Sequence, residues 1–319
     1  MKAGPALLLA VLALPVLAAP RLDLTGYADR DGAIAVQHHG GTVDPYFALQ
    51  ALLLAQDHGL DASRHALAWA DWLIPRQKPD GTFDRFCRTD GAWAACKTAD
   101  ADDSLLALWL RFLESHPAEL QRNPAWRKSH AAATTSLQRL EDKGRGIYMV
   151  SPVYLHGLFM DNLEVWSYRP AHAGVQSARF PDFGRTLHET FWDPGQKRYH
   201  VSTQLEQRSA PQAFYPDAVA QVFPLLVGFP HVPGGARAWY AQWIKAHRAT
   251  WLLQVRHDFA WGLVAVVALD QHDFASARCW LRETRAARHG PHWTATDEVV
   301  AQVLQARSIA PARAEEDCR

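Results

Sequence analysis

The feature that most constrains the fold is a run of helix-length segments with almost no candidate strand between them. Apolar residues recur in these segments with the period of an α-helix. The segments cover residues 44–58, 62–75, 100–115, 123–141, 158–169, 171–190, 212–228, 234–249, 257–269, 273–288 and 293–307. Gly, Pro and Asp occupy the joins, and the stretch YHVS with its flanks forms at most a small hairpin. The chain is therefore predicted to be all-α.

The predicted helices alternate in character along the chain. One kind is apolar nearly all round, as in PYFALQALLLA and FAWGLVAVVAL, and the other is amphipathic, as in ASRHALAWADWLI and FASARCWLRETRAARH. Helices of the first kind are buried, whereas those of the second face water on one side. Antiparallel hairpins of alternating buried and half-buried helices predict two concentric rings, an (α/α)6 barrel with five and a half hairpins visible. An open helical solenoid is the alternative, but no fixed short repeat supports it.

Residues 1–18 are predicted to be a signal peptide. Lys2 gives the charged start, residues 6–17 the apolar stretch, and Val16-Leu17-Ala18 the cleavage site. No later apolar run reaches the roughly 18 residues that a membrane-spanning helix needs. We therefore expect a periplasmic or secreted protein in which residues 19–319 form a single domain, acting as a monomer.

Charge and motifs narrow the range of partners. Lys plus Arg number 33 and Asp plus Glu number 33, so no net field draws the chain to nucleic acid or to an anionic membrane surface. There is no GxSxG motif, phosphate loop, dinucleotide fingerprint or close Cys/His spacing. We expect no cofactor and no metal.

Four cysteines in an exported chain suggest disulfides. Cys87 and Cys96 bracket a short loop that a bridge would stiffen, and Cys279 would then pair with Cys318. Four cysteines allow three connectivities, and the sequence alone does not choose among them.

Each predicted inner helix opens with acidic residues. They are Asp44, then Asp100, Asp102 and Asp103, then Asp161, Asp217, Asp258 and Asp297. Parallel inner helices bring their starts to one rim of the barrel, so these carboxylates should converge there. Any one of them is explained as an N-cap, and Asp161 with Glu164 fits a capping box. One helix needs one cap, however, so the TADADD cluster favours a function.

Crowded carboxylates have divergent pKa values, which lets one act as a general acid while another acts as a base. Glycoside hydrolysis needs that division of labour. Aromatic rings beside the acids suit the C–H faces of a sugar, although a helical barrel also needs large side chains in its core. The predicted substrate-binding residues are Tyr46, Asp100, Asp103, Asp161, Glu164, Trp166, Tyr215, Trp261 and Trp293.

Three stretches resemble the family-eight glycoside hydrolases, a group of bacterial endoglucanases among the six-hairpin glycosidases. They are VDPYFALQALLLA, ADADDSLLALWL and YPDAVAQVFPL, and together they cover about three dozen residues. The resemblance implies that Asp217 is the general base, that Asp102 holds the sugar and that Asp44 stands at the position of the general acid. The chain has Asp where the family has Glu at that position, and Pro216 interrupts the Tyr-Asp pair.

The leading prediction is thus a glycoside hydrolase that cleaves a polysaccharide with two rim carboxylates. A polysaccharide lyase on the same barrel is an alternative, with Tyr215 or a histidine as the base. Such a site should present a cation to a uronate, for which Arg85, Arg88 and Arg169 are candidates. A catalytically silent sugar-binding or scaffold protein is the third possibility.

Overall fold

The computed structural model describes residues 19–168, 182–208, 210, 212–314 and 316–318. The predicted signal peptide, residues 1–18, lies outside this part of the chain, as does Arg169.

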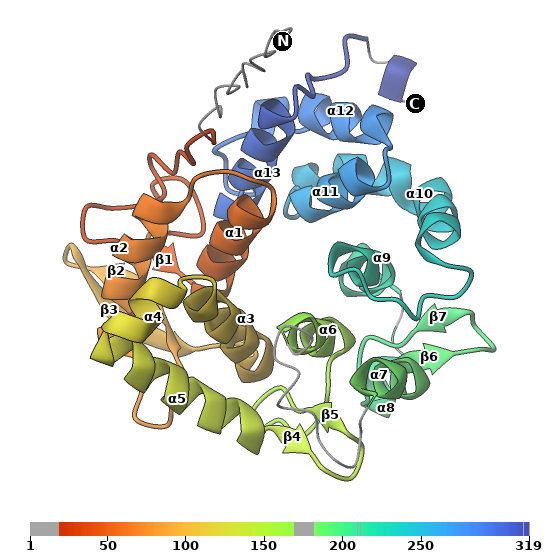
Figure 1. Ribbon diagram of the computed structural model, residues 1–319. Coiled ribbons are helices and arrows are strands. Elements are labelled where there is room, and N and C mark those ends of the chain that lie inside the picture. Colours follow the sequence, from red (N-terminus) through yellow and green to blue (C-terminus); the bar gives the residue numbers. More distant parts are fainter. Residues whose placement is uncertain (1–18, 169–181, 209, 211, 315, 319) are drawn as a thin grey trace, which may run out of the picture.

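Six helices form a closed inner ring, in which each packs against the next and the last returns to the first (Figure 1). These are α1 (Pro45–Asp57), α3 (Asp102–Glu114), α6 (Phe159–Tyr168), α9 (Val219–Leu226), α11 (Gly262–Asp270) and α13 (Ala295–Ala306). The apolar segments of the sequence provide this ring, because an inner helix has neighbours on every side. The predicted all-α (α/α)6 barrel is confirmed.

The outer helices connect successive inner helices (Figure 1). They are α2 (Ser63–Leu73), α5 (Pro124–Arg139), α7 (Phe183–Phe191), α10 (Ala236–Leu253) and α12 (Phe274–Glu283), with the short α4 (Pro117–Arg122) and α8 (Leu205–Arg208) in the connections. Single helical turns lie at Ile74–Arg76, Gln254–Arg256, Arg285–Ala287 and Glu316–Cys318, and a π-helical turn at Phe214–Ala218 precedes α9. Large rings such as Trp69, Trp126 and Trp280 are fully buried on the outer helices.

The extended segment 19–43 closes the barrel where α13 meets α1. Leu24 is fully buried, and the neighbouring Asp23 amide donates to Gln302 of α13 at 2.9 Å. On the other side, the Leu22 amide donates to the carbonyl of Asp61, just before α2, at 3.0 Å. This segment takes the place of a sixth outer helix, which explains the odd half hairpin of the sequence pattern.

A three-stranded antiparallel sheet was not predicted. Its strands are β1 (Thr42–Val43), β2 (Asp84–Thr89) and β3 (Ala92–Thr98), with Cys87 opposite Ala94. Two-residue strands form two further hairpins, β4 (Glu141–Asp142) with β5 (Ile147–Tyr148) and β6 (Trp192–Asp193) with β7 (Arg198–Tyr199). The last of these lies at the hairpin expected from YHVS. The sequence of β2 is mostly polar and that of β3 is rich in alanine, and neither alternates clearly between polar and apolar residues, so the sequence gave no strand signal there.

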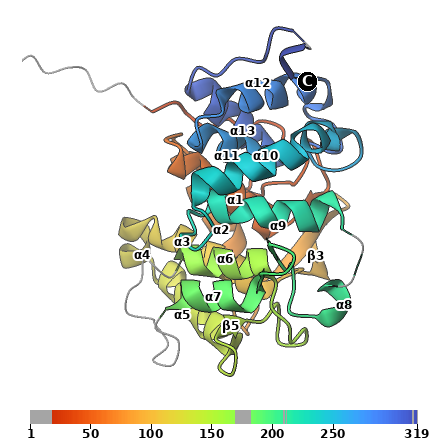
Figure 2. The same ribbon diagram turned by 90° about the vertical axis from the view of Figure 1, so that its right-hand side faces the viewer.

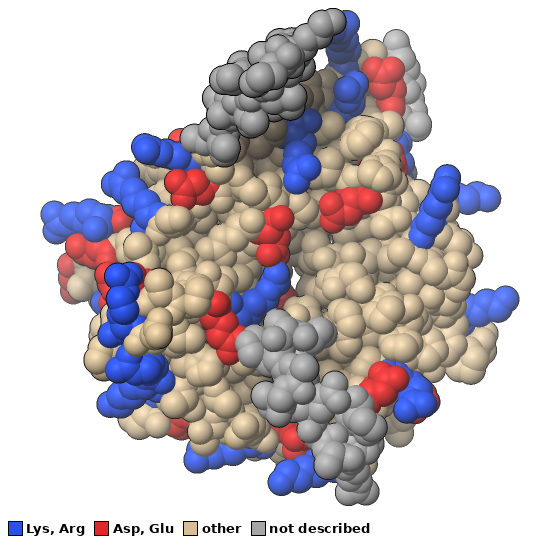
Figure 3. All heavy atoms as spheres, viewed as in Figure 1, with Lys and Arg blue, Asp and Glu red and all other residues tan. Residues whose placement is uncertain are grey.

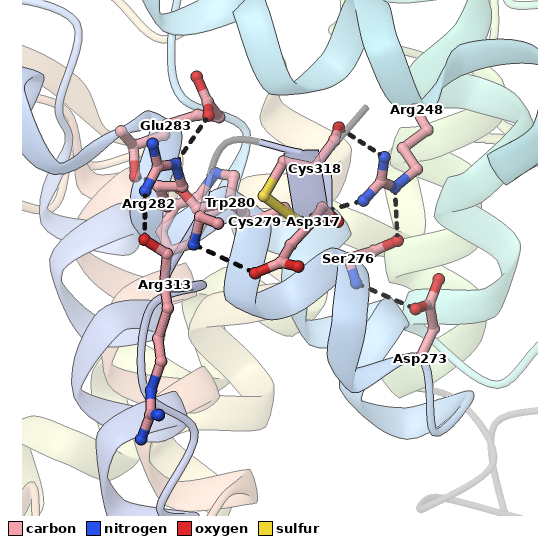
Figure 4. The surroundings of a disulfide bond; sticks show 12 residues. Arg248, Asp273, Ser276, Cys279, Trp280, Arg282, Glu283, Arg313, Asp317 and Cys318 are labelled. Atoms are coloured by element: carbon pink, nitrogen blue, oxygen red, sulfur yellow. Dashed lines mark hydrogen bonds and ion pairs between the residues drawn. A yellow bond between two sulfur atoms is a disulfide. The ribbon is translucent and has the colours of Figure 1, made fainter.

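Both predicted disulfides are present. Cys87–Cys96 links β2 to β3, and Cys279–Cys318 ties the C-terminal tail to α12. Arg248 of α10 reinforces the second bridge, because its guanidinium donates to the Ser276 hydroxyl at 3.0 Å and to the Cys318 carbonyl at 2.8 Å (Figure 4). The tail is therefore held by α10 and α12 together.

The two ends of the barrel differ. At the end where α9 begins, β3 and α8 project from the rings (Figure 2). At the opposite end, where α3 leads into α4, acidic and basic side chains mix on the surface (Figure 3). Arg111 of α3 pairs there with Asp57 of α1 at 2.7 Å. Among the described residues, no helix combines the length and the apolar character needed to cross a membrane.

Candidate active site

The starts of all six inner helices surround one cavity of about 560 Å³. Its polar and aromatic lining residues include Asp44, Tyr46, Arg85, Asp100, Asp161, Tyr215, Asp258, Trp261 and Asp297. Apolar side chains such as Phe47, Leu105 and Phe223 form the deeper walls. The parallel inner helices thus gather carboxylates from distant parts of the chain, as the pattern of helix starts predicted.

Asp44 combines a cap with an ion pair. Its Oδ1 accepts a hydrogen bond from the Tyr46 amide at 3.1 Å, and its Oδ2 lies 2.6 Å from Nε of Arg85. The same guanidinium donates through Nη2 to Asp100, so Arg85 bridges the two carboxylates. Burial raises the pKa of Asp44, and the charge of Arg85 opposes that rise. The unpredicted strand β2 supplies this arginine.

A second group of acids lies at the starts of α3 and α6. Asp103 is fully buried, and neither of its carboxylate oxygens has a hydrogen-bond partner within the described residues. Glu164 is also buried, and its Oε1 accepts from the Tyr46 hydroxyl at 2.8 Å. Burial, together with repulsion by Asp161, raises the pKa of both carboxyls well above their usual range. We call Asp103, Asp161 and Glu164 the buried acid group.

Asp161 is the member of this group that lines the cavity. Its Oδ2 is buried without a partner in the part of the chain that the structure describes. Burial, and to a lesser extent the charge of Asp100, raises its pKa to about 7. The carboxyl therefore keeps its proton to a higher pH than an ordinary aspartate does. Hydrophobic surroundings and like charges are the two causes that give a carboxylic acid this property.

An aromatic pair also lines the cavity. Tyr215 and Trp261 stack with their centroids 4.9 Å apart at an interplanar angle of 26°, and Tyr215 is 51% exposed. The Trp261 indole donates to Oδ2 of Asp258 at 3.1 Å. Trp261 also has a φ of +51°, uncommon for a bulky residue, and it directly precedes α11. Burial and the nearby carboxylates, Asp161 first among them, raise the pKa of Tyr215 to about 12.

Asp297 lines the same cavity but is a structural cap. Its Oδ2 accepts from the amide and hydroxyl of Thr294 at 2.9 and 2.7 Å, which closes a capping box at the start of α13. Its Oδ1 accepts from the Gly262 amide at 2.8 Å and so joins α13 to α11. A Cβ at Gly262 would approach that oxygen to 2.9 Å, which explains the glycine.

Several predicted site residues do not line this cavity. Asp102 begins α3 but lies within electrostatic reach of Lys78 instead, and burial raises its pKa to about 6. Asp217 lines a separate cavity beside α10, where it lies 3.3 Å from Arg198. Trp166 packs edge-on against Phe229, and Trp293 stacks on Trp280 in the core.

The structure therefore brings together Asp44, Tyr46, Asp100, Asp161, Tyr215 and Trp261 of the predicted residues, with Asp103 and Glu164 buried beside them. The cavity wall also holds Asp258, which the sequence showed as an acid before an inner helix, and Arg85, which was a candidate only for the lyase alternative. The position of Arg85 beside Asp44 depends on a sheet that the sequence did not reveal.

No protein-family model matches the chain, and no curated protein matches it in sequence. Solved structures do match. One is described as a novel alpha-amylase from Clostridium perfringens, with 9% identity, a TM-score of 0.56 and coverage of 88% of this chain and 94% of that chain. The shared property is the fold.

Two further matches come from Thermus thermophilus. An uncharacterized conserved protein has 13% identity, a TM-score of 0.52 and coverage of 88% of this chain and 97% of its own. A GH63 mannosylglycerate hydrolase in complex with glucose has 14% identity, a TM-score of 0.52 and coverage of 89% of this chain and 97% of its own. All three matches show a shared fold, and the resemblance to family eight stays a prediction.

Proposed function

We propose that this protein is a glycoside hydrolase that cleaves a polysaccharide or oligosaccharide in the cavity at the inner-helix starts. The observation that carries the proposal is Asp161, a carboxyl with a pKa of about 7 that lines a cavity with Asp258 and a stacked aromatic pair. Two solved structures of the same fold are described as glycosidases, which supports the reaction class.

Asp161 is the general acid in this proposal. Its proton passes to the glycosidic oxygen as the bond from that oxygen to the anomeric carbon breaks. A general acid works best when its pKa is close to the operating pH, as for Asp161. The family resemblance implied that Asp44 stands at the position of the general acid, but Arg85 pairs with its carboxylate and opposes the rise in its pKa that burial causes.

Asp258 is the general base. It accepts a proton from the attacking water, whose oxygen forms the new bond to the anomeric carbon. The Trp261 indole orients the carboxylate, and the Tyr215 ring lies within electrostatic reach of both Asp161 and Asp258. A sugar that stacks on Tyr215 would therefore lie near both carboxylates.

Asp44, Arg85 and Asp100 form a polar network that suits sugar hydroxyls. Hydroxyl groups both donate and accept hydrogen bonds, so they match carboxylate acceptors and a guanidinium donor in one network. We assign these residues to substrate positioning, together with Tyr46 and Trp261. Asp102 and Asp217, which the family resemblance implied as sugar-holding residue and base, lie outside the cavity and receive no role in this mechanism.

A polysaccharide lyase fits the cavity less well. Arg85 is the one Lys or Arg among the described residues that line it, and this side chain already bridges Asp44 and Asp100. The carboxylate of a uronate would therefore lie near other carboxylates, with no unpaired Lys or Arg among the described lining residues to bind it. A catalytically silent sugar-binding protein would use the same surfaces. A measurement of turnover therefore distinguishes a silent binding protein from a glycoside hydrolase.

We further propose that the protein is exported. Its two disulfides support an oxidising compartment, because such bonds are rare in the cytosol.

The test is release of new reducing ends by the mature protein from a panel of neutral, amino-sugar and acidic polysaccharides. Ultraviolet absorbance of an unsaturated uronate is followed in parallel. We expect reducing ends without absorbance, and loss of release in Asp161→Asn and Asp258→Asn. Growth of the absorbance would indicate a lyase. Loss of release in a folded Asp217→Asn variant, with Asp258→Asn active, would return the role of base to Asp217.

A further inference from the structure

The cavity at the inner-helix starts has helices on every side. Each of the six inner helices contributes to its wall, and none contributes a residue beyond the sixth position of the helix. The lining residues farthest along each helix are Gln50, Leu105, Asp161, Phe223, Leu263 and Asp297. Because the inner ring is closed, a ligand at this depth cannot leave the cavity sideways.

The cavity also ends inside the barrel. Beyond its lining residues, the middle of each inner helix has side chains that are at most 5% exposed, namely Leu53, Leu108, Val165, Val222, Val266 and Val300. A channel through the barrel that was wide enough for a sugar chain would expose some of these side chains. Within the described residues, the cavity is therefore a pocket that is closed at its inner end.

Hydrogen bonds cross the inner part of this pocket from α13 to α6. The Thr296 hydroxyl donates to Oε1 of Gln50 at 3.3 Å. Nε2 of Gln50 donates to the Tyr46 hydroxyl at 3.1 Å, and that hydroxyl donates to Glu164 at 2.8 Å. Tyr46, Gln50 and Thr296 line the pocket, and we call them the polar floor.

The polar floor keeps hydrogen-bonding capacity for a ligand. Nε2 of Gln50 has two hydrogens but one partner within the described chain. The Thr296 hydroxyl donates to its neighbours and can still accept. Apolar side chains such as Leu105 and Phe223 lie on the same pocket wall. A sugar ring, with apolar faces and hydroxyl groups at its edge, matches this combination.

The position of the proposed proton donor requires the cleaved bond to enter the pocket. Asp161 is the third residue of α6, and its Oδ2 is buried, whereas the Asp100 side chain at the mouth is 73% exposed. The volume of about 560 Å³ is that of a small-molecule pocket. A polymer that lay across the mouth would not reach Asp161 or the polar floor. A chain that enters by its end would reach both.

We propose that the enzyme is exo-acting, so that the pocket admits one end of a glycan chain and the polar floor binds hydroxyl groups of the terminal sugar. The bond that is cleaved lies close to that end, at the depth of Asp161. This inference rests on the proposed function for the reaction and for the class of ligand. The closed pocket and the polar floor do not depend on it.

The first test follows product sizes when the wild type acts on the glycan that it cleaves in the panel above. We expect one short sugar from the first turnovers, and new reducing ends with little fall in the viscosity of a polysaccharide. Chromatography at early conversion measures the product sizes. Fragments of many lengths at the earliest times, with a rapid fall in viscosity, would overturn the proposal.

The second test measures binding without turnover. Calorimetry of the mature Asp161→Asn protein uses cellohexaose, maltohexaose and mannohexaose as probes. We expect at least one to bind, and its trisaccharide to bind about equally well, because only the end of the chain enters the pocket.

Gln50→Met, added to this protein, removes the floor amide with little change in volume. It should weaken binding at least about tenfold, because one hydrogen bond to a sugar hydroxyl is worth about that factor. Gln56→Met is the matched control on the same helix outside the pocket, since Gln56 also has two side-chain partners, His116 and Ser115. The control should bind as the parent does.

Equal affinities of Gln50→Met and Gln56→Met would overturn the role of the polar floor. An affinity that rises steeply from trisaccharide to hexasaccharide, or no binding of any probe, would overturn the chain-end pocket. Circular dichroism and the melting temperature check that both variants fold. Binding that Gln50→Met weakens, in a protein whose wild type releases no reducing ends, would refute the reaction and keep the pocket, so the two proposals can fail separately.

Discussion

Asp161 at the start of α6 and Asp297 at the start of α13 line the same cavity, yet their surroundings differ. Asp297 accepts three hydrogen bonds, from Thr294 and Gly262, which partly offset the effect of its burial and leave its pKa at about 6. Asp161 has a buried oxygen without a partner in the described chain, beside two further buried carboxyls. The difference teaches that an acid at a helix start is a cap when its oxygens are satisfied and a candidate for chemistry when they are not.

The largest effect is expected for Asp161→Asn. The variant keeps the size of the side chain and loses its proton, so kcat should fall by about 10²–10⁴-fold. In the wild type, kcat should fall as the pH rises through about 7, because Asp161 loses its proton. The variant should lack this pH dependence. Initial rates of reducing-end release from pH 4 to 9 measure both effects. A variant with more than a tenth of the wild-type kcat would remove Asp161 from the acid role.

For Asp297→Ala, the main effect should be on stability. The variant loses a capping box and leaves the Gly262 amide buried without its acceptor, which should cost about 1–3 kcal/mol. Urea unfolding of the mature protein gives the free energy of unfolding. An unchanged value would show that Asp297 is not the structural cap described here, and the comparison with Asp161 would lose its basis.

A smaller, pH-dependent effect is expected for Asp103→Asn. The folded protein holds the pKa of this carboxyl well above that of the unfolded chain. As pH rises above about 4, the unfolded state loses this proton first, so the wild type loses stability with rising pH. The variant does not titrate there. Its free energy of unfolding, relative to the wild type, should therefore increase between pH 4 and pH 8, and a constant difference would contradict the buried acid group.

The sequence predicted the barrel because the alternation of buried and amphipathic helices is a local and repeated signal. It did not predict which acids face the cavity. Asp102 and Asp103 are neighbours, but successive residues on a helix point about 100° apart, so a small change in where α3 begins exchanges their directions. Neither of them lines the cavity, and Asp103 is the one that is fully buried, within electrostatic reach of Asp161 and Glu164.

The positions of two further residues, Asp217 and Arg85, depended on tertiary structure. Asp217 lies in the π-helical turn Phe214–Ala218 and lines the separate cavity beside α10, although its sequence context resembles an inner-helix start. Arg85 reaches Asp44 from a strand whose pairing is secured by the Cys87–Cys96 bridge. Neither contact follows from a periodic pattern.

The most direct test of the central claim is the response of Asp161→Asn to leaving-group chemistry. Its kcat is compared with that of the wild type on two glycosides of the same sugar, one with a methyl and one with a dinitrophenyl leaving group. A general acid matters for a poor leaving group and little for a good one. We predict a loss of at least ~100-fold on the methyl glycoside and less than about tenfold on the dinitrophenyl glycoside. Equal losses on both would contradict the assignment of Asp161 as the proton donor.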